Sequence, residues 1–470
     1  MLQIADWGLL NANCPGVIHF FHSSYDRVKE AVFTRFQNAG GEPMSKKGLI
    51  VFIIVVIVLL WLIPRLIRPA LGQAASTQAP HFGEGGLPLY ERDPNFPKVP
   101  SKWRMGFGSD VAVDAQNHIW ILSRPHTLAH PRSTPPDLVS VPAPPVMEFD
   151  TDGNFIQAWG GDSGPGYQWP SNEHGIHIDY KGFVWILGNA DGKSNNPATL
   201  PNDNQILKFT REGKFVMAIG KSGQTGSNAT QVLKGATRLY VYPKTNELFV
   251  SDGYGNSRIM VYDAGTGQFK RMWGAYGHKP LDIDARPPRS EPARNPWVAV
   301  SEVLQQFGSP VHDVDISNDG LVYVADRGNK RVQVFTPDGK FIGEQFVGLD
   351  SKYPLQARSV AFSPDAAQRF LFVAGAPDIY ILNRKTLEVL GSFNIGSPQG
   401  DPPGHLIAVD HKGNVYAVQA ELSGSDGHSG GAGAYKFTFK GYSPRVSCPP
   451  CASTRRIESV TNDPTDAGSR

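Results

Sequence analysis

One stretch decides the fold of this chain: PVHDVDISNDGLVYVADRGNKRVQVFTPDGKFIGEQF, residues 310–346. It contains four short runs rich in Val, Ile, Tyr and Phe, in which apolar and polar residues alternate. A period of two places alternate side chains on opposite faces of a β-strand, and the DG dipeptides supply the positive φ of tight hairpin turns. The stretch therefore predicts two consecutive hairpins, which together make one four-stranded antiparallel sheet.

The same unit recurs along the chain. Its copies begin at Ser109, His174, Ala236, Pro310, Arg358 and Gly404. Self-similarity at a long period marks a repeat architecture, and six sheets arranged radially leave only short, protected edges. We therefore expect an all-β fold, a six-bladed β-propeller over residues 101–442. A solenoid is the alternative, but four-stranded units of this length favour ring closure.

The segments beside the repeats have other compositions. Residues 71–100 are rich in Pro, Gly and small residues, which predicts a linker. The segment PLYERDPNFPKVPSKWRMGF, residues 88–107, is a candidate for the strand that closes the ring. Each first hairpin is followed by a second one, which is degenerate in the last copy, YKFTFKGYS. Residues 443–470 are polar, so we expect a flexible C-terminal tail.

A continuous apolar run, GLIVFIIVVIVLLWLIP, occupies residues 48–64 and follows Lys46 and Lys47. A run without charge predicts either a transmembrane signal anchor or a cleaved signal peptide over residues 44–70. The basic pair before it favours a cytoplasmic N-terminus, which places the propeller outside the cytoplasm, periplasmic or extracellular, membrane-anchored or secreted. We expect Met44 to be the true start and leave residues 1–43 unassigned.

Composition limits the function. Lys and Arg total 45 and Asp and Glu total 43, and no basic stripe with interleaved aromatics occurs, so we expect no nucleic-acid partner. The three cysteines, Cys14, Cys448 and Cys451, all lie outside the repeats, so the core needs no disulfide. We expect Cys448 and Cys451 to form a tail disulfide or to remain free thiols.

Three of the thirteen histidines hold equivalent positions in the repeats. His174, His312 and His405 each stand at the start of the innermost strand of the second, fourth or sixth blade. Alternate blades of a six-bladed ring are related by a three-fold arrangement, so three imidazoles converge on the axis. Three neutral imidazoles with an open fourth position are the ligand set of a catalytic zinc site. The other histidines, such as His118 and His177, are expected at the surface or in loops.

Two further stretches carry a resemblance. FVSDGYGNSRIMVYD, residues 249–263, and VYVADRGNKRVQVF, residues 322–335, resemble motifs of NHL-repeat propellers and in particular of the peptidylglycine α-amidating lyase family, also called peptidyl-α-hydroxyglycine α-amidating lyase. The resemblance covers residues 100–441. It implies that the three histidines bind zinc, that Tyr254 is the catalytic base, and that Arg124 and Arg327 hold a substrate carboxylate.

The activity that this resemblance implies is that of an extracytoplasmic metal-dependent lyase. Such an enzyme cleaves an N-substituted α-hydroxyglycine, a carbinolamide on a peptide or small molecule, to an amide and glyoxylate. One departure concerns calcium. In the family an Asp linked to a calcium ion follows the third zinc histidine, and here that position is Leu406. Because calcium prefers carboxylate oxygens, the substitution argues against a calcium ion.

Two alternatives remain. A non-catalytic NHL propeller would bind a protein or a cell-surface ligand on its loop face, shaped by residues 124–145, 275–306 and 423–433. A lactonase-like hydrolase ranks last, because calcium-dependent sugar lactonases resemble this fold but use Glu, Asn and Asp where this chain has histidines. If the apolar segment is retained, the membrane is also a partner.

Overall fold

The computed structural model describes residues 86–129, 141–190, 203–282, 305–351, 356–396, 404–419 and 433–443, all within the compact unit Ala79–Arg470. The expected apolar segment at 44–70, residues 1–43, the three cysteines and the tail after Ser443 lie outside these residues. In the described ranges, no helix is both long enough and apolar enough to cross a bilayer.

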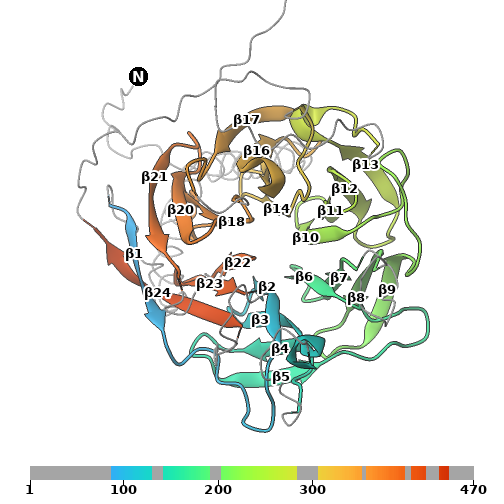
Figure 1. Ribbon diagram of the computed structural model, residues 1–470, viewed down its shortest axis with the longest axis horizontal. Helices are drawn as coiled ribbons and strands as arrows, with labels where there is room; N and C mark the ends of the chain where they lie inside the picture. The colour runs from blue at the N-terminus through green and yellow to red at the C-terminus, as the bar shows by residue number, and fades with distance from the viewer. Residues whose placement is uncertain are drawn as a thin grey trace, which may run out of the picture. The chain divides into compact units, whose positions relative to one another are not determined.

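Six four-stranded antiparallel sheets surround a common centre, which confirms the six-bladed β-propeller (Figure 1). The first three blades are β2 (Phe107–Val113), β3 (Ile119–Arg124), β4 (Val146–Phe149) and β5 (Phe155–Trp159); β6 (Glu173–Ile178), β7 (Val184–Gly188), β8 (Gln205–Phe209) and β9 (Phe215–Gly220); and β10 (Ala236–Tyr242), β11 (Glu247–Asp252), β12 (Arg258–Asp263) and β13 (Phe269–Trp273).

The fourth and fifth blades follow the same order, from the innermost strand outward. They are β14 (Asp313–Ile316), β15 (Val322–Asp326), β16 (Arg331–Phe335) and β17 (Phe341–Phe346); and β18 (Ser359–Phe362), β19 (Phe370–Ala374), β20 (Asp378–Asn383) and β21 (Val389–Asn394). Short 3-10 helices in the described ranges are η1 (Pro125–Ala129), η2 (Ala275–Gly277) and η5 (Arg327–Asn329).

The sixth blade joins the two ends of the propeller. It consists of β22 (Ile407–Val409), β23 (Val415–Val418), β24 (Ala434–Tyr442) and, as its outermost strand, β1 (Pro88–Asp93). Pro88 pairs with Tyr442 and Asp93 with Lys436. The stretch that sequence analysis treated as a degenerate hairpin is a single strand, β24, because β1 already supplies its partner. The propeller thus begins at Pro88, within the range assigned to a linker and closing strand.

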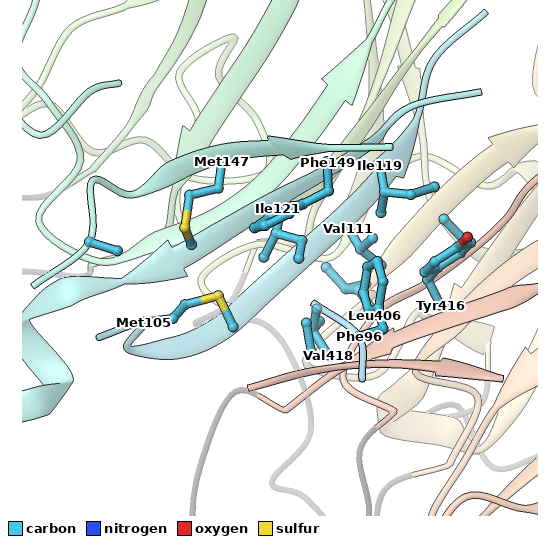
Figure 2. Packing of buried hydrophobic residues seen from close by; sticks show 13 residues of the cluster. Phe96, Met105, Val111, Ile119, Ile121, Met147, Phe149, Leu406, Tyr416 and Val418 are labelled. Atoms are coloured by element: carbon cyan, nitrogen blue, oxygen red, sulfur yellow. The ribbon is translucent and has the colours of Figure 1, made fainter. Parts of the chain in front are cut away.

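The hydrophobic core lies between neighbouring blades. In the cluster between the first and sixth blades, Ile121 and Phe149 face Leu406, Tyr416 and others, all buried (Figure 2). Equivalent clusters occur at the other blade boundaries. Burying one face of every strand against the next blade is the result expected from the period-two pattern.

A repeated turn fixes the first hairpin of several blades. The Asp179 carboxylate accepts hydrogen bonds from the backbone N–H groups of Lys181 and Phe183 and from Trp185 Nε1 at 2.8 Å. Asp114 and Trp120 repeat this arrangement in the first blade. A single carboxylate therefore satisfies the turn and the indole of a buried tryptophan together.

Candidate metal centre and its surroundings

The strand register shows which residues of the six inner strands are equivalent. Five inner-strand residues are equivalent because each pairs with the same position of the second strand in its blade. The pairs are Asp110 with Leu122, Gly175 with Leu187, Arg238 with Ser251, Asp313 with Ala325, and Ser359 with Ala374. In the sixth blade the Val418 N–H donates to Leu406. We call these six inner residues the second ring. The residues before them form the first ring: Ser109, His174, Thr237, His312, Arg358 and His405.

The first ring brings the three predicted histidines together. One nitrogen from each ring of His174, His312 and His405 lies within 4.8 Å of the other two. The ring centroids are 4.8–5.1 Å apart, and the three residues are buried. This spacing lets one small ion contact all three side chains.

Each histidine is oriented by the following blade. Nδ1 of His174 contacts the Thr237 carbonyl oxygen at 2.7 Å, Nδ1 of His312 contacts that of Arg358 at 2.6 Å, and Nδ1 of His405 contacts that of Ser109 at 2.7 Å. A carbonyl only accepts, so each Nδ1 carries the proton and each neutral ring presents an Nε2 lone pair. Metal-binding histidines are commonly fixed in this way.

Electrostatics keep the three rings neutral. Burial is the largest cause that holds the pKa of His174, His312 and His405 well below its usual range. The positive charge of Arg327 lowers all three pKa values further, and that of Arg124 lowers those of His174 and His405. Neutral imidazole is the form that binds a metal, so this environment favours coordination over protonation.

Tyr254 lies directly against this centre. Its hydroxyl oxygen is 3.4 Å from Nε2 of both His174 and His312, and Arg327 donates to it from Nη1 at 3.2 Å. Tyr254 and Arg327 are half-buried. Nε of Arg327 is buried and has no hydrogen-bond partner among the described residues. Asp326 does not pair with Arg327; it binds Arg331 at 2.7 Å.

Arg124, at the end of β3, is buried beside the centre. Its Nε donates to the carbonyl oxygen of Glu173 at 2.7 Å, and Glu173 precedes the first metal-site histidine. The structure therefore gathers the three histidines, Tyr254 and the two arginines at one end of the inner strands. Their roles as ligands, base and anion holders stay predictions.

The sequence argument missed Arg238 of the second ring. Its guanidinium lies among the inner strands and pairs with Asp110 and Asp313. In one strand, ATRLYVY, this arginine has the appearance of an ordinary polar residue. A comparison of the six residues that follow the first-ring positions would have revealed it. These residues are Asp, Gly, Arg, Asp, Ser and Leu in blade order, so one arginine accompanies two aspartates.

Two other observations correct or limit the sequence argument. His177 is not a surface or loop residue: it belongs to β6 and accepts the Val241 N–H at 3.2 Å through Nε2. A second group with potential metal ligands, Asp114, His118 and Glu148, is bridged by Arg211. Because that guanidinium already pairs with both carboxylates, the group is better explained as an ion-pair network.

The fold is a six-bladed β-propeller, and the model of the NHL repeat matches residues 311–335. NHL repeat-containing protein 3 of Homo sapiens is 26% identical over 355 residues, covering 70% of this chain and 81% of that protein. Peptidylglycine alpha-amidating monooxygenase of Rattus norvegicus is 28% identical, over 53% of this chain and 22% of that protein. Peptidyl-alpha-hydroxyglycine alpha-amidating lyase 1 of Drosophila melanogaster is 25% identical, over 55% of this chain and 44% of that protein.

Proposed function

We propose that the propeller is a zinc-dependent carbon–nitrogen lyase that acts on N-substituted α-hydroxyglycines. The observation that carries the proposal is the position of the Tyr254 hydroxyl, 3.4 Å from two neutral histidine nitrogens and 3.2 Å from Arg327. A base, a cation and a metal-binding set at one point suit a reaction that removes a hydroxyl proton. The similarity to amidating lyases agrees with this choice.

The donor set fits zinc. His174, His312 and His405 would hold the ion through Nε2, because each Nδ1 proton is engaged by a backbone carbonyl. When bound, zinc would act as a Lewis acid that polarises a substrate oxygen. The three carbonyl partners are backbone atoms in or directly before inner strands, so the ligands are already oriented before an ion arrives.

Tyr254 is the group placed to take the proton. In the reaction the hydroxyl O–H bond breaks, its electrons form the C=O bond of glyoxylate, and the C–N bond electrons leave with the amide nitrogen, which takes up a proton. An ordinary tyrosine has a pKa near 10 and is a weak base at neutral pH. Arg327 donates to the Tyr254 oxygen, and a guanidinium there stabilises negative charge on it.

Arg327 would also bind the carboxylate of the substrate. Its buried Nε has no partner among the described residues, although the same side chain reaches Tyr254 through Nη1. A guanidinium pairs with a carboxylate in a planar, two-point contact. Arg124, held by the Glu173 carbonyl, would add positive charge near His174. The substrate would thus be held by the carboxylate attached to the carbon that bears its hydroxyl group.

The test is an assay of the full chain with N-benzoyl-α-hydroxyglycine, with zinc quantified on the same preparation. We expect about one zinc per chain and release of benzamide and glyoxylate in equal amounts. A zinc-loaded protein that releases no glyoxylate would refute the lyase. The extracytoplasmic location and membrane anchoring predicted from residues 44–70 remain part of the same proposal, to be checked by fractionation.

A second candidate is a non-catalytic propeller that binds a protein or cell-surface ligand. The observation that favours it is the match to NHL repeat-containing protein 3, which covers a larger share of this chain than the lyase matches do. On this account the histidine centre is structural. Binding of a partner by protein stripped of zinc, together with absent lyase activity, would favour it.

A further inference from the structure

We propose that Arg238 is the fixed cation of the propeller axis and that it makes the fold independent of calcium. The inference concerns the second ring, not the lyase chemistry, and it holds whether or not the proposed reaction is correct. It predicts that one side chain supplies a positive charge at the place where a calcium ion would otherwise bind.

The Arg238 guanidinium contacts inner strands of four other blades. Nη1 donates to Asp313 Oδ2 at 2.8 Å and to Ser359 Oγ at 2.9 Å. Nη2 donates to the carbonyl oxygens of Val111 and Ile407, each at 3.1 Å. Nε lies 3.3 Å from Asp110 Oδ2. One cation therefore links β10 to β2, β14, β18 and β22.

These partners are all oxygen atoms of the kind that calcium prefers: two carboxylates, two backbone carbonyls and one hydroxyl. They are also engaged elsewhere. Asp110 accepts the Ile176 N–H at 2.9 Å, and Asp313 accepts the Val360 N–H at 2.8 Å. The guanidinium donates to Asp313, to Ser359 and to the two carbonyl oxygens and pairs with Asp110, so a calcium ion would have to displace it.

The residue expected to bind calcium is absent from this ring. Leu406 stands at its position and is buried in the cluster between the first and sixth blades, among Val111 and Tyr416 (Figure 2). A leucine in that cluster offers no ligand oxygen. The residues present thus do not fit a calcium ion, and the arginine places one positive charge beside the remaining two carboxylates.

Burial makes this pairing necessary. Burial raises the pKa of Asp110 to about 7, and the Arg238 charge opposes the rise. Without a cation, two carboxylates would face each other in the buried centre, which is strongly unfavourable. Removing the guanidinium should leave a set of vacated oxygens that a calcium ion can bind.

The experiment measures the melting temperature of the full chain at pH 8 in calcium-depleted buffer without chelator, with or without 5 mM CaCl₂ and at equal zinc content, for the wild type and Arg238→Ala. We expect the same wild-type value in both buffers, and for the variant a value at least about 5 °C higher with calcium. A wild-type melting temperature that depends on calcium overturns the inference, even if the variant fails to fold. A folded variant that ignores calcium overturns it as well.

The matched control is Arg238→Ala combined with Asp110→Asn and Asp313→Asn. It has the same missing side chain and lacks both carboxylates that pair with Arg238, so calcium should not raise its melting temperature. Equal responses in the single and triple variants would contradict the assignment of these oxygens. Zinc content of the same samples reports the histidine centre separately, so a failure here and a failure of the lyase proposal are distinguishable.

Discussion

The first ring and the second ring at the propeller axis are adjacent along each inner strand, one residue apart, but their side chains differ in kind. In the first ring, His174, His312 and His405 each bond a backbone carbonyl through Nδ1, and one nitrogen of each ring lies within 4.8 Å of the other two. In the second ring, Arg238 joins Asp110 and Asp313 in a closed set of ion pairs. The first ring is the proposed site for a metal ion, whereas the second ring already contains the cation of Arg238.

The largest effect should follow from opening the first ring. His312→Ala removes one of three ligands, so we expect zinc content to fall from about one per chain to near zero. Glyoxylate release should drop at least about 1000-fold, because several kcal/mol of metal stabilisation is lost. Mass spectrometry measures the zinc content, and the assay with N-benzoyl-α-hydroxyglycine measures glyoxylate release. His411→Ala, on an exposed turn, is the control and should change neither.

Replacing the neighbour of the first ring should separate chemistry from metal binding. Tyr254→Phe keeps the ring but removes the hydroxyl, so we expect kcat to fall about 100- to 10000-fold while zinc content is unchanged. Kinetics and metal analysis on one preparation measure both. Tyr180→Phe, an exposed residue, should be fully active. Normal turnover by Tyr254→Phe would remove this residue from the proposed base role.

The substrate carboxylate gives a third test. Arg327→Met removes the proposed anion contact, and we expect kcat/KM to fall about 100-fold with zinc retained. Arg327→Lys should recover part of that loss, since it keeps the charge but not the planar fork. A substrate analogue with a neutral amide in place of the carboxylate gives the control. If Arg327→Met lowered kcat/KM for this analogue as much as for the carboxylate substrate, Arg327 would contact another group of the substrate.

A change in the second ring should give the reverse pattern. Asp313→Asn breaks a buried ion pair with Arg238, so we expect the free energy of unfolding to fall by about 3 kcal/mol. The first-ring ligands stay in place, and the folded variant should hold as much zinc as the wild type. Chemical denaturation followed by metal analysis tests both. Loss of zinc from a fully folded variant would show that the two rings are not independent.

The smallest effect is expected far from both rings. Asp179→Asn weakens the turn that orders Lys181 and Trp185, so unfolding should become easier by about 1–2 kcal/mol. Neither zinc content nor turnover should change. Denaturation curves measure the change in stability. A loss of turnover in the folded variant would mean that the outer turns affect the histidine centre.

Local patterns account for what sequence alone could predict. The blades follow from alternation and DG turns, which act within about forty residues. The three histidines were found because they occupy the same offset in alternate copies. Arg238 was not, since its partners Asp110, Asp313 and Ile407 come from blades distant in sequence. Only the folded ring of blades brings Arg238 Nε to 3.3 Å from Asp110 Oδ2.

The pairing of β1 with β24 has a kinetic consequence. Pro88 and Tyr442 belong to the first and last strands of the propeller. During synthesis β1 must remain unpaired until nearly the whole domain has left the ribosome, and contacts so distant in sequence slow folding. Until then the edge of β1 is exposed to other strands. Conditions that delay the end of translation should therefore favour aggregation, even though no contact in the native state has changed.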